Sequence, residues 1–259
     1  MDEHYWILKR CGLFEKLSND QIQLIESRSR ARKFAKGSVI YLPSDQSDSV
    51  MLVVSGRIKL YHLTPDGKQA LLGIIDPGEL FGELAILADS QREEFAECME
   101  PAHIVAIPRS VMQQLMESHP DVSLGVTRLI GLRQRRIERR LKSLLFRSNR
   151  DRLIHLLVEL VEKYGQTVPE GVQIGIRLSH QDLANIIGST RETVTVLLGE
   201  LGADKLLTIK KRKIIVPHPA RLAESIGLPP PTLPVQVTNV PVIPPRAKYG
   251  SASGDLLSR

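Results

Sequence analysis

Residues 178–201 read LSHQDLANIIGSTRETVTVLLGEL, and this stretch predicts two short helices joined by a tight turn. Ser179 and Ser189 each have an acidic residue three positions later, which is the spacing of a helix capping box. Gly188 follows the first predicted helix and is typical of a helix end, because glycine adopts the left-handed backbone conformation at little cost. The stretch is therefore a candidate helix–turn–helix.

Each predicted helix has one apolar face at helical spacing. The residues on these faces are Leu183, Ile186 and Ile187 in the first helix, and Val194, Leu197, Leu198 and Leu201 in the second. If the faces pack together, the second helix points Arg191, Glu192 and Thr195 outward near its N-terminus. That arrangement suits a helix whose first turns enter a DNA major groove. An ordinary helical hairpin with no further role would show the same spacing.

The segment GSTRETVTVLLGEL, residues 188–201, resembles the recognition segment of the cyclic-AMP receptor protein and fumarate–nitrate regulator (CRP/FNR) superfamily. The resemblance implies that Arg191 reads a guanine edge and that Glu192 accepts a hydrogen bond from a cytosine amino group. It also implies a third base reader, usually an arginine, where this chain has Val196, so we expect the half-site to differ at that base pair. Candidate phosphate contacts near the helix starts are Ser179, Gln181, Ser189 and Thr190.

The residues around this motif complete a predicted winged domain over 147–222. Residues 151–165 predict an amphipathic helix, and residues 173–178, QIGIRL, predict a short strand. Residues 206–218 predict two strands around Lys211 and Arg212. This hairpin is interpreted as a basic wing lying along DNA phosphates, with a plain surface hairpin as the alternative.

Composition is compatible with a polyanionic partner. The chain has 259 residues, a formal net charge of +6 and a pI of about 9.4. Its apolar runs are too short to span a membrane, and its first residues lack the apolar stretch of a signal peptide. The two cysteines, Cys11 and Cys98, are expected to be free thiols. These features together favour a cytoplasmic protein without membrane attachment.

The first half of the chain has the two-residue period of strands between residues 37 and 107. The predicted strands are SVIYLP, VMLVVSG, RIKLYHL, ALLGII and HIVAIP, punctuated by glycine turns. Their order resembles the cyclic-nucleotide-binding jelly roll of the same superfamily, with Gly56 as a turn glycine. We therefore expect an α+β protein with a jelly-roll sensor domain over residues 8–121.

The resemblance extends to GELFGELAIL, residues 78–87, which matches the segment that opens the ligand pocket in cyclic-nucleotide binders. It implies that Gly82, Glu83 and Leu84 line an effector pocket, with backbone N–H groups available to an anion. Where cyclic-nucleotide binders place an Arg-Ser or Arg-Thr pair, this chain has Glu93 and Glu94, and Arg92 stands one residue early. Ile137 and Glu138 occupy the positions that present Thr and Ser to adenine. Two carboxylates would repel a phosphodiester, so we expect an effector other than cyclic AMP, or none.

A short helix is predicted over residues 109–118, followed by a long helix over residues 122–146. Its apolar stripe comprises Val126, Ile130, Ile137, Leu141, Leu144 and Leu145. The resemblance makes it the dimerisation helix of a homodimer, relaying the sensor's state to half-sites about one helical turn apart on a near-palindromic operator. We further hypothesise that Glu93 or Glu94 pairs with Arg133, Arg135 or Arg136 across the dimer, in place of a ligand phosphate.

Several alternatives stay open at this stage. Residues 227–259 are proline-rich and predict a disordered tail. No cofactor or metal is expected: two cysteines are too few for an iron–sulfur cluster, and His62, His103 and Cys98 are only minor candidates as haem ligands. A thiol switch is unsupported, and enzyme motifs are absent from the sequence.

The resemblance implies RNA polymerase as a partner, while the sequence gives neither the effector nor the choice between activation and repression. A ligand-binding protein whose helix–turn–helix merely packs is the rival interpretation.

Overall fold

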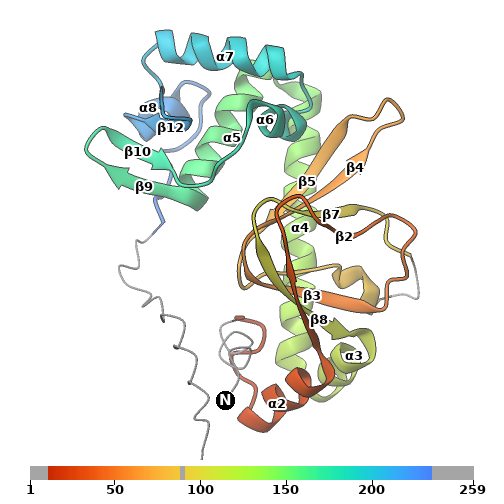
Figure 1. Cartoon of the computed structure of the whole chain (residues 1–259). Coiled ribbons are helices and arrows are strands. Elements are labelled where there is room, and N and C mark those ends of the chain that lie inside the picture. The colour runs from red at the N-terminus through yellow and green to blue at the C-terminus, as the bar shows by residue number, and fades with distance from the viewer. Residues whose placement is uncertain (1–10, 88–90, 235–259) are drawn as a thin grey trace, which may run out of the picture.

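The computed structural model describes residues 11–87 and 91–234. A β roll comes first, a long helix follows, and a helix–turn–helix domain ends the described chain (Figure 1). This α+β architecture confirms the predicted fold class. Positions 235–259 of the predicted tail lie outside the described residues, and residues 228–234 form neither helix nor strand.

Two four-stranded antiparallel sheets form the roll, in the orders β1-β8-β3-β6 and β2-β7-β4-β5. Their strands are β1 (Arg30–Phe34), β2 (Val39–Tyr41), β3 (Ser49–Ser55), β4 (Ile58–Leu63), β5 (Gln69–Ile75), β6 (Leu80–Phe81), β7 (Phe95–Cys98) and β8 (Ala102–Pro108). A short 3-10 helix, η1 (Glu83–Ile86), follows β6. The five strands predicted from the sequence are present as β2, β3, β4, β5 and β8.

Strand β3 is apolar on both faces because its sheet has a core on each side. Val50 and Leu52 pack under α2 (Asn19–Arg28) and α3 (Arg109–Ser118), while Val53 faces the core between the two sheets. Side chains of a strand alternate between its faces, so a run such as VMLVV supplies both cores at once.

The long helix α4 (Pro120–Phe146) spans the molecule from α3 to the helix–turn–helix domain (Figure 1). Val122 and Val126 at its start are buried against the roll. Further along, Ile137 and Leu141 are each 55% exposed, and Leu144 is 42% exposed. Their spacing of four and three residues places them on one face, which is left without a partner in the single chain. No helix within the described ranges is long and apolar enough to cross a membrane.

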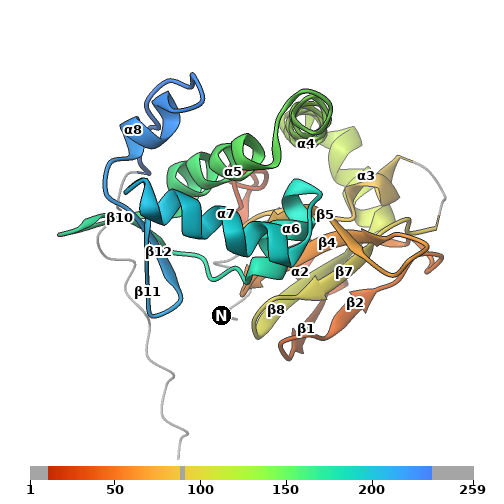
Figure 2. The same ribbon diagram turned by 90° about the horizontal axis from the view of Figure 1, so that it is seen from above.

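The C-terminal domain is built on α5 (Asn149–Tyr164), whose inner face is buried along its length. Around it lie β9 (Gly165–Val168), β10 (Gly171–Ile174), α6 (His180–Ile187), α7 (Arg191–Ala203), β11 (Thr208–Lys210), β12 (Lys213–Val216) and α8 (Pro219–Glu224). The four strands form one antiparallel sheet in the order β11-β12-β10-β9. The view from above shows α7 in front of α5, with α6 next to it (Figure 2).

Candidate nucleic-acid interface and sensing pocket

The start of α6 is fixed by the predicted capping box. The Ser179 hydroxyl accepts a hydrogen bond from the Asp182 backbone N–H at 3.1 Å, and the Asp182 carboxylate accepts one from the Ser179 N–H at 2.8 Å. Gly188 ends the helix with φ 66°, in the left-handed region, as predicted. The turn therefore has the local structure that the sequence indicates.

The predicted cap of α7 is wrong by one residue. Thr190, not Ser189, is the N-cap, and its hydroxyl accepts a hydrogen bond from the Thr193 N–H at 3.2 Å. Either residue could cap a helix by type, but Thr190 has the extended backbone that the capping position requires. Arg191 and Glu192 are consequently the first two residues of the helix.

The outer face of α7 carries the side chains predicted to read DNA. Arg191, Glu192 and Thr195 are exposed, while Val194 on the opposite face is fully buried. Within the described part of the chain, no ion pair or hydrogen bond engages the guanidinium group of Arg191 or the carboxylate of Glu192. Figure 1 shows α7 lying across the end of the molecule, away from the roll. Their charged groups are thus available to a ligand.

The hydroxyl of Thr195 is already occupied. It donates to the Arg191 carbonyl at 2.8 Å and lies 2.8 Å from Nδ1 of His180. His180, the first residue of α6, was not predicted as a site residue. Its position directly after the capping serine was the only signal in the sequence. Val196, in place of the third base reader, is 60% exposed.

The candidate phosphate contacts differ in how available they are. Thr190 and Gln181 are exposed, although the Gln181 amide donates to Asn185 at 2.8 Å. Ser179 is exposed but held by its capping box, and Ser189 is half-buried. On the wing, Lys211 and Arg212 form the exposed two-residue turn between β11 and β12, with φ of 48° and 62°.

A cavity of about 440 Å³ lies between the roll and α4. Its lining includes six of the eight predicted effector residues: Gly82, Glu83, Leu84, Glu94, Ile137 and Glu138. The remaining lining residues are Leu60, Leu72, Gly73, Ile75, Ile130, Arg133, Gln134 and Arg136. This volume is within the range of small-molecule sites. The lining combines apolar side chains with charged groups of both signs.

Arg92 and Glu93 do not line this cavity. The Arg92 guanidinium is buried, donates to the Gly82 carbonyl at 2.9 Å and to the Ser49 carbonyl, and stacks 4.5 Å from the centre of the Tyr41 ring. A buried guanidinium needs acceptors for its N–H groups, and here backbone carbonyls supply them. Glu93 is exposed to solvent.

Glu83 and Glu94, which do line the cavity, each have a partner in the same chain. Arg133 of α4 pairs with Glu83 and also donates to the Leu80 carbonyl. Arg133 therefore contacts a different carboxylate from the hypothesised Glu93 or Glu94. Glu94 accepts a hydrogen bond from the Tyr41 hydroxyl at 2.6 Å. Burial, and then the Glu94 carboxylate, raise the pKa of Tyr41 well above its usual range, so the phenol stays a donor.

Both cysteines are buried free thiols. Burial raises the pKa of each, to about 11 for Cys98. Thiolate is the reactive form, so neither residue has the features of a redox-sensing cysteine.

Both halves of the chain match known domain families. Residues 31–119 match the Cyclic nucleotide-binding domain, and residues 151–225 match the Crp-like helix-turn-helix domain. The second match decides against a helix–turn–helix that merely packs. Among solved structures, the c-di-GMP responsive regulator CLP of Xanthomonas campestris is similar, with a TM-score of 0.69 and 24% identity over 77% of this chain and 99% of that one.

Two relatives align with this chain over most of their own length. The Global nitrogen regulator of Synechocystis is 30% identical over 193 residues, covering 74% of this chain and 86% of the relative. The CRP-like cAMP-activated global transcriptional regulator of Mycobacterium tuberculosis is 25% identical over 223 residues, covering 86% and 98% respectively. The chain belongs to the CRP/FNR family of dimeric, sequence-specific DNA-binding transcription regulators.

Proposed function

We propose that the first turn of α7 reads the operator, with Arg191 donating to a guanine edge and Glu192 accepting from a cytosine amino group. The observation that carries this proposal is the exposure of both charged side chains beside a buried Val194. A bidentate arginine–guanine pair is the commonest specific contact in a major groove. Phosphate contacts are assigned to Ser179, Gln181, Ser189, Thr190, Lys211 and Arg212, and Thr195 lies beside the base readers.

Two copies of the chain are proposed to pair along α4, through the exposed face that contains Ile137, Leu141 and Leu144. The two recognition helices then meet half-sites about one helical turn apart on a near-palindrome. The proposed division is a sensor over 8–121, a dimerisation helix over 122–146, a winged domain over 147–222 and a tail over 227–259. We assign the protein to the cytoplasm. We further propose RNA polymerase as the partner of the DNA-bound dimer.

This assignment is tested with an operator selected from random DNA by the full-length chain. Arg191→Ala is expected to weaken operator binding by about 1–3 kcal/mol and to relax preference at one base pair of each half-site. Arg212→Ala is the matched control, because the loss of a phosphate contact lowers affinity equally for all sequences. Equal losses for Arg191→Ala on operator and random DNA would show that Arg191 touches only phosphate.

The sensing pocket is proposed not to accept cyclic AMP. Its lining carries the carboxylates of Glu83, Glu94 and Glu138 against the guanidinium groups of Arg133 and Arg136, and Arg133 is already paired with Glu83. A phosphodiester would therefore find carboxylates where it needs cations. The relatives are named for nitrogen regulation in one case and cAMP activation in the other, so family membership does not dictate the effector. Another small molecule gates the dimer, or it is constitutively active.

Operator affinity measured by fluorescence anisotropy tests this second proposal. We expect the dissociation constant to be unchanged by millimolar cyclic AMP, and we expect calorimetry to detect no binding of the nucleotide. A tenfold tightening of operator binding by cyclic AMP would refute it, since that shift corresponds to about 1.4 kcal/mol of coupling.

A further inference from the structure

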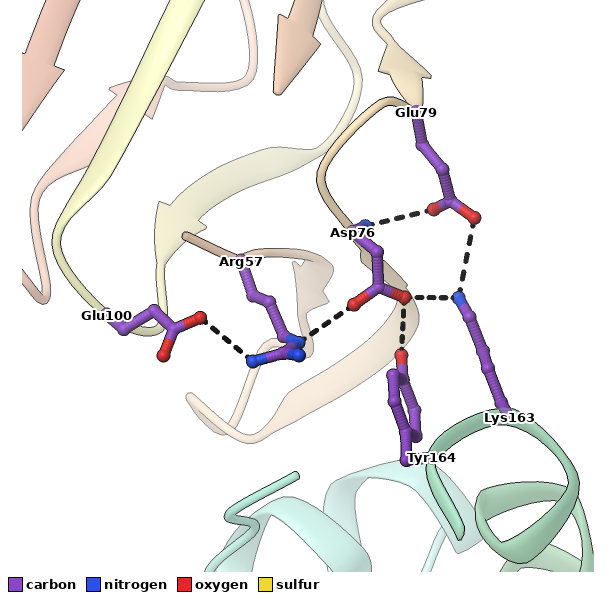
Figure 3. A network of polar contacts seen from close by, with 6 residues as sticks. All are labelled: Arg57, Asp76, Glu79, Glu100, Lys163 and Tyr164. Carbon is purple, nitrogen blue, oxygen red and sulfur yellow. Dashed lines mark hydrogen bonds and ion pairs between the residues drawn. The ribbon is translucent and has the colours of Figure 1, made fainter. Parts of the chain in front are cut away.

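Six side chains form a polar network between the roll and the DNA-binding domain, which we call the Asp76 cluster (Figure 3). Its members are Arg57, Asp76, Glu79, Glu100, Lys163 and Tyr164. Oδ1 of Asp76 accepts from Nε of Arg57 at 2.8 Å. Oδ2 accepts from the Tyr164 hydroxyl at 2.7 Å and pairs with Nζ of Lys163 at 2.5 Å. One carboxylate thus joins three donors.

The cluster crosses the boundary between the two domains. Asp76 and Glu79 lie in the loop between β5 and β6, whereas Lys163 and Tyr164 are the last two residues of α5. Glu79 strengthens the crossing, since it accepts from the Asp76 N–H at 3.0 Å and pairs with Lys163 at 3.4 Å. The Asp76 side chain is only 15% exposed, and charge-assisted bonds in such a setting are stronger than at an open surface.

A second set of contacts holds the same two domains together. Tyr61, Leu71 and Ile74 of the roll belong to the hydrophobic core of the DNA-binding domain. Arg140 of α4 links the long helix, rather than the DNA-binding domain, to the same strand β5, since it donates to the carbonyls of Leu71 and Leu72 at 2.8 and 2.7 Å. Apolar packing is non-directional, whereas hydrogen bonds require defined angles, so the Asp76 cluster fixes the orientation of the end of α5 relative to the roll.

The orientation fixed in this way suits DNA binding. Figure 1 shows α7 across the end of the molecule toward which α4 runs. A two-fold axis along α4 would therefore place both copies of α7 on one face, as a palindromic operator requires.

We propose that the Asp76 cluster is an intrachain brace that holds the DNA-binding domain in its operator-binding orientation, with Lys163 and Tyr164 as positioning residues. The route from sensor to DNA then includes the β5–β6 loop as well as the long helix. Ile75, directly before Asp76, and Gly82 and Glu83, shortly after Glu79, all line the sensing pocket. The same short segment therefore contacts both the effector site and α5.

The brace is tested with the full-length dimer and two variants, Tyr164→Phe and Lys163→Met. Each is expected to weaken operator binding about tenfold, within the usual range of coupling between sites. Glu100→Ala is the matched control: it removes the carboxylate that accepts a 3.0 Å bond from Arg57 in the same network, and this contact does not cross the domain boundary. Tyr164→Phe keeps the ring and loses one hydroxyl, so it remains informative if Lys163→Met fails to fold. Affinity within twofold of the parent for folded, dimeric Tyr164→Phe would overturn the proposal.

A cross-link distinguishes positioning from general stability. The side chains of Gln69 on β5 and Asn185 on α6 meet at 3.5 Å across the same boundary. Cysteines are introduced at these two positions and joined by a short bismaleimide, which reacts with them selectively because the native thiols are buried. The cross-link should restore operator affinity to Tyr164→Phe, because it fixes the two domains in the same orientation. Cross-linked Tyr164→Phe that still binds tenfold more weakly would contradict a positioning role.

The link to the pocket rests on the proposed sensing function and has a separate test. Leu84→Trp fills the cavity and is expected to change operator affinity in the parent chain, and to change it less when combined with Tyr164→Phe. Equal effects in both backgrounds would contradict transmission through the brace. If Leu84→Trp has no effect in the parent, the sensing function fails, whereas the Tyr164→Phe and cross-linking results still decide the brace.

Discussion

Lys211 and Arg212 are unusual residues for the turn that they form. Both have a positive φ in a two-residue hairpin connection, where the backbone favours Asn-Gly. Side chains with a Cβ lose energy in the left-handed region, by about 1–2 kcal/mol each relative to the ordinary helical conformation. The wing tip therefore keeps two cations at a cost in stability, which fits a turn selected for contact with phosphates.

Replacing both residues, Lys211→Asn with Arg212→Gly, is expected to separate stability from binding. Urea unfolding should show a gain of about 1 kcal/mol, because both new residues adopt the left-handed conformation more easily. Operator affinity should fall, and its dependence on salt should become shallower, because fewer phosphates are neutralised. Lys205→Gly is the control: Lys205 also has a positive φ, of 57°, but lies outside the wing, so it should gain stability with little loss of binding. An unchanged salt dependence in the double variant would remove the wing from the interface.

At the scale of elements, the sequence predicts those whose apolar spacing is regular. The helices α6 and α7 follow from faces such as Leu183 and Ile187, and the strands β3, β4, β5 and β8 follow from apolar runs. Strand β1, RARKF, could not be predicted in this way, because nearly all of its residues are exposed. It exists because it pairs with β8 along five positions, and pairing partners distant in the chain leave no periodic signal. The short strands β6, β7 and β9 are missed for a different reason, because two to four residues are too few to show a two-residue period.

The candidate site shows the same division. Arg191 and Glu192 could be identified because their exposure follows from the periodicity of one helix. The environment of Arg92 could not, because a local pattern does not say whether a guanidinium faces a pocket or the carbonyls of Gly82 and Ser49. The cap at Thr190 depended on backbone dihedral angles that two adjacent capping residues leave ambiguous.

At the scale of the whole molecule, the contacts between domains are the least predictable from sequence. Asp76 and Tyr164 are 88 positions apart, and each alone is an ordinary surface residue type. Their meeting depends on how β5, which contributes to the core inside the roll and to the core around α5, is placed against α5. A regulator that changes state needs such contacts to be breakable, and polar groups of this kind respond to pH and salt more than apolar packing does.

The Asp76 carboxyl makes the contacts between the roll and α5 sensitive to pH over a defined range. Burial alone would raise its pKa, but hydrogen bonds from Lys163 and Tyr164 outweigh burial, and the net pKa lies below the usual value near 3.9. A carboxyl whose pKa is lower in the folded state stabilises it fully above the unfolded pKa, and this contribution disappears as the pH falls through the folded pKa. Asp76→Asn should therefore be clearly less stable than the parent chain at pH 6–7, and the difference should shrink below about pH 4.

Urea unfolding of both proteins from pH 7 to pH 3 measures this difference. Asp66→Asn is the control, because Lys68 and then Thr64 lower the pKa of Asp66 to about 2 while that carboxyl is fully exposed. Water and salt screen an exposed pair, so its low pKa should produce little difference in stability at any pH. A gap between Asp76→Asn and the parent that stays constant across the range would mean that Asp76 acts through shape alone, and that its charge does not hold α5 to the roll.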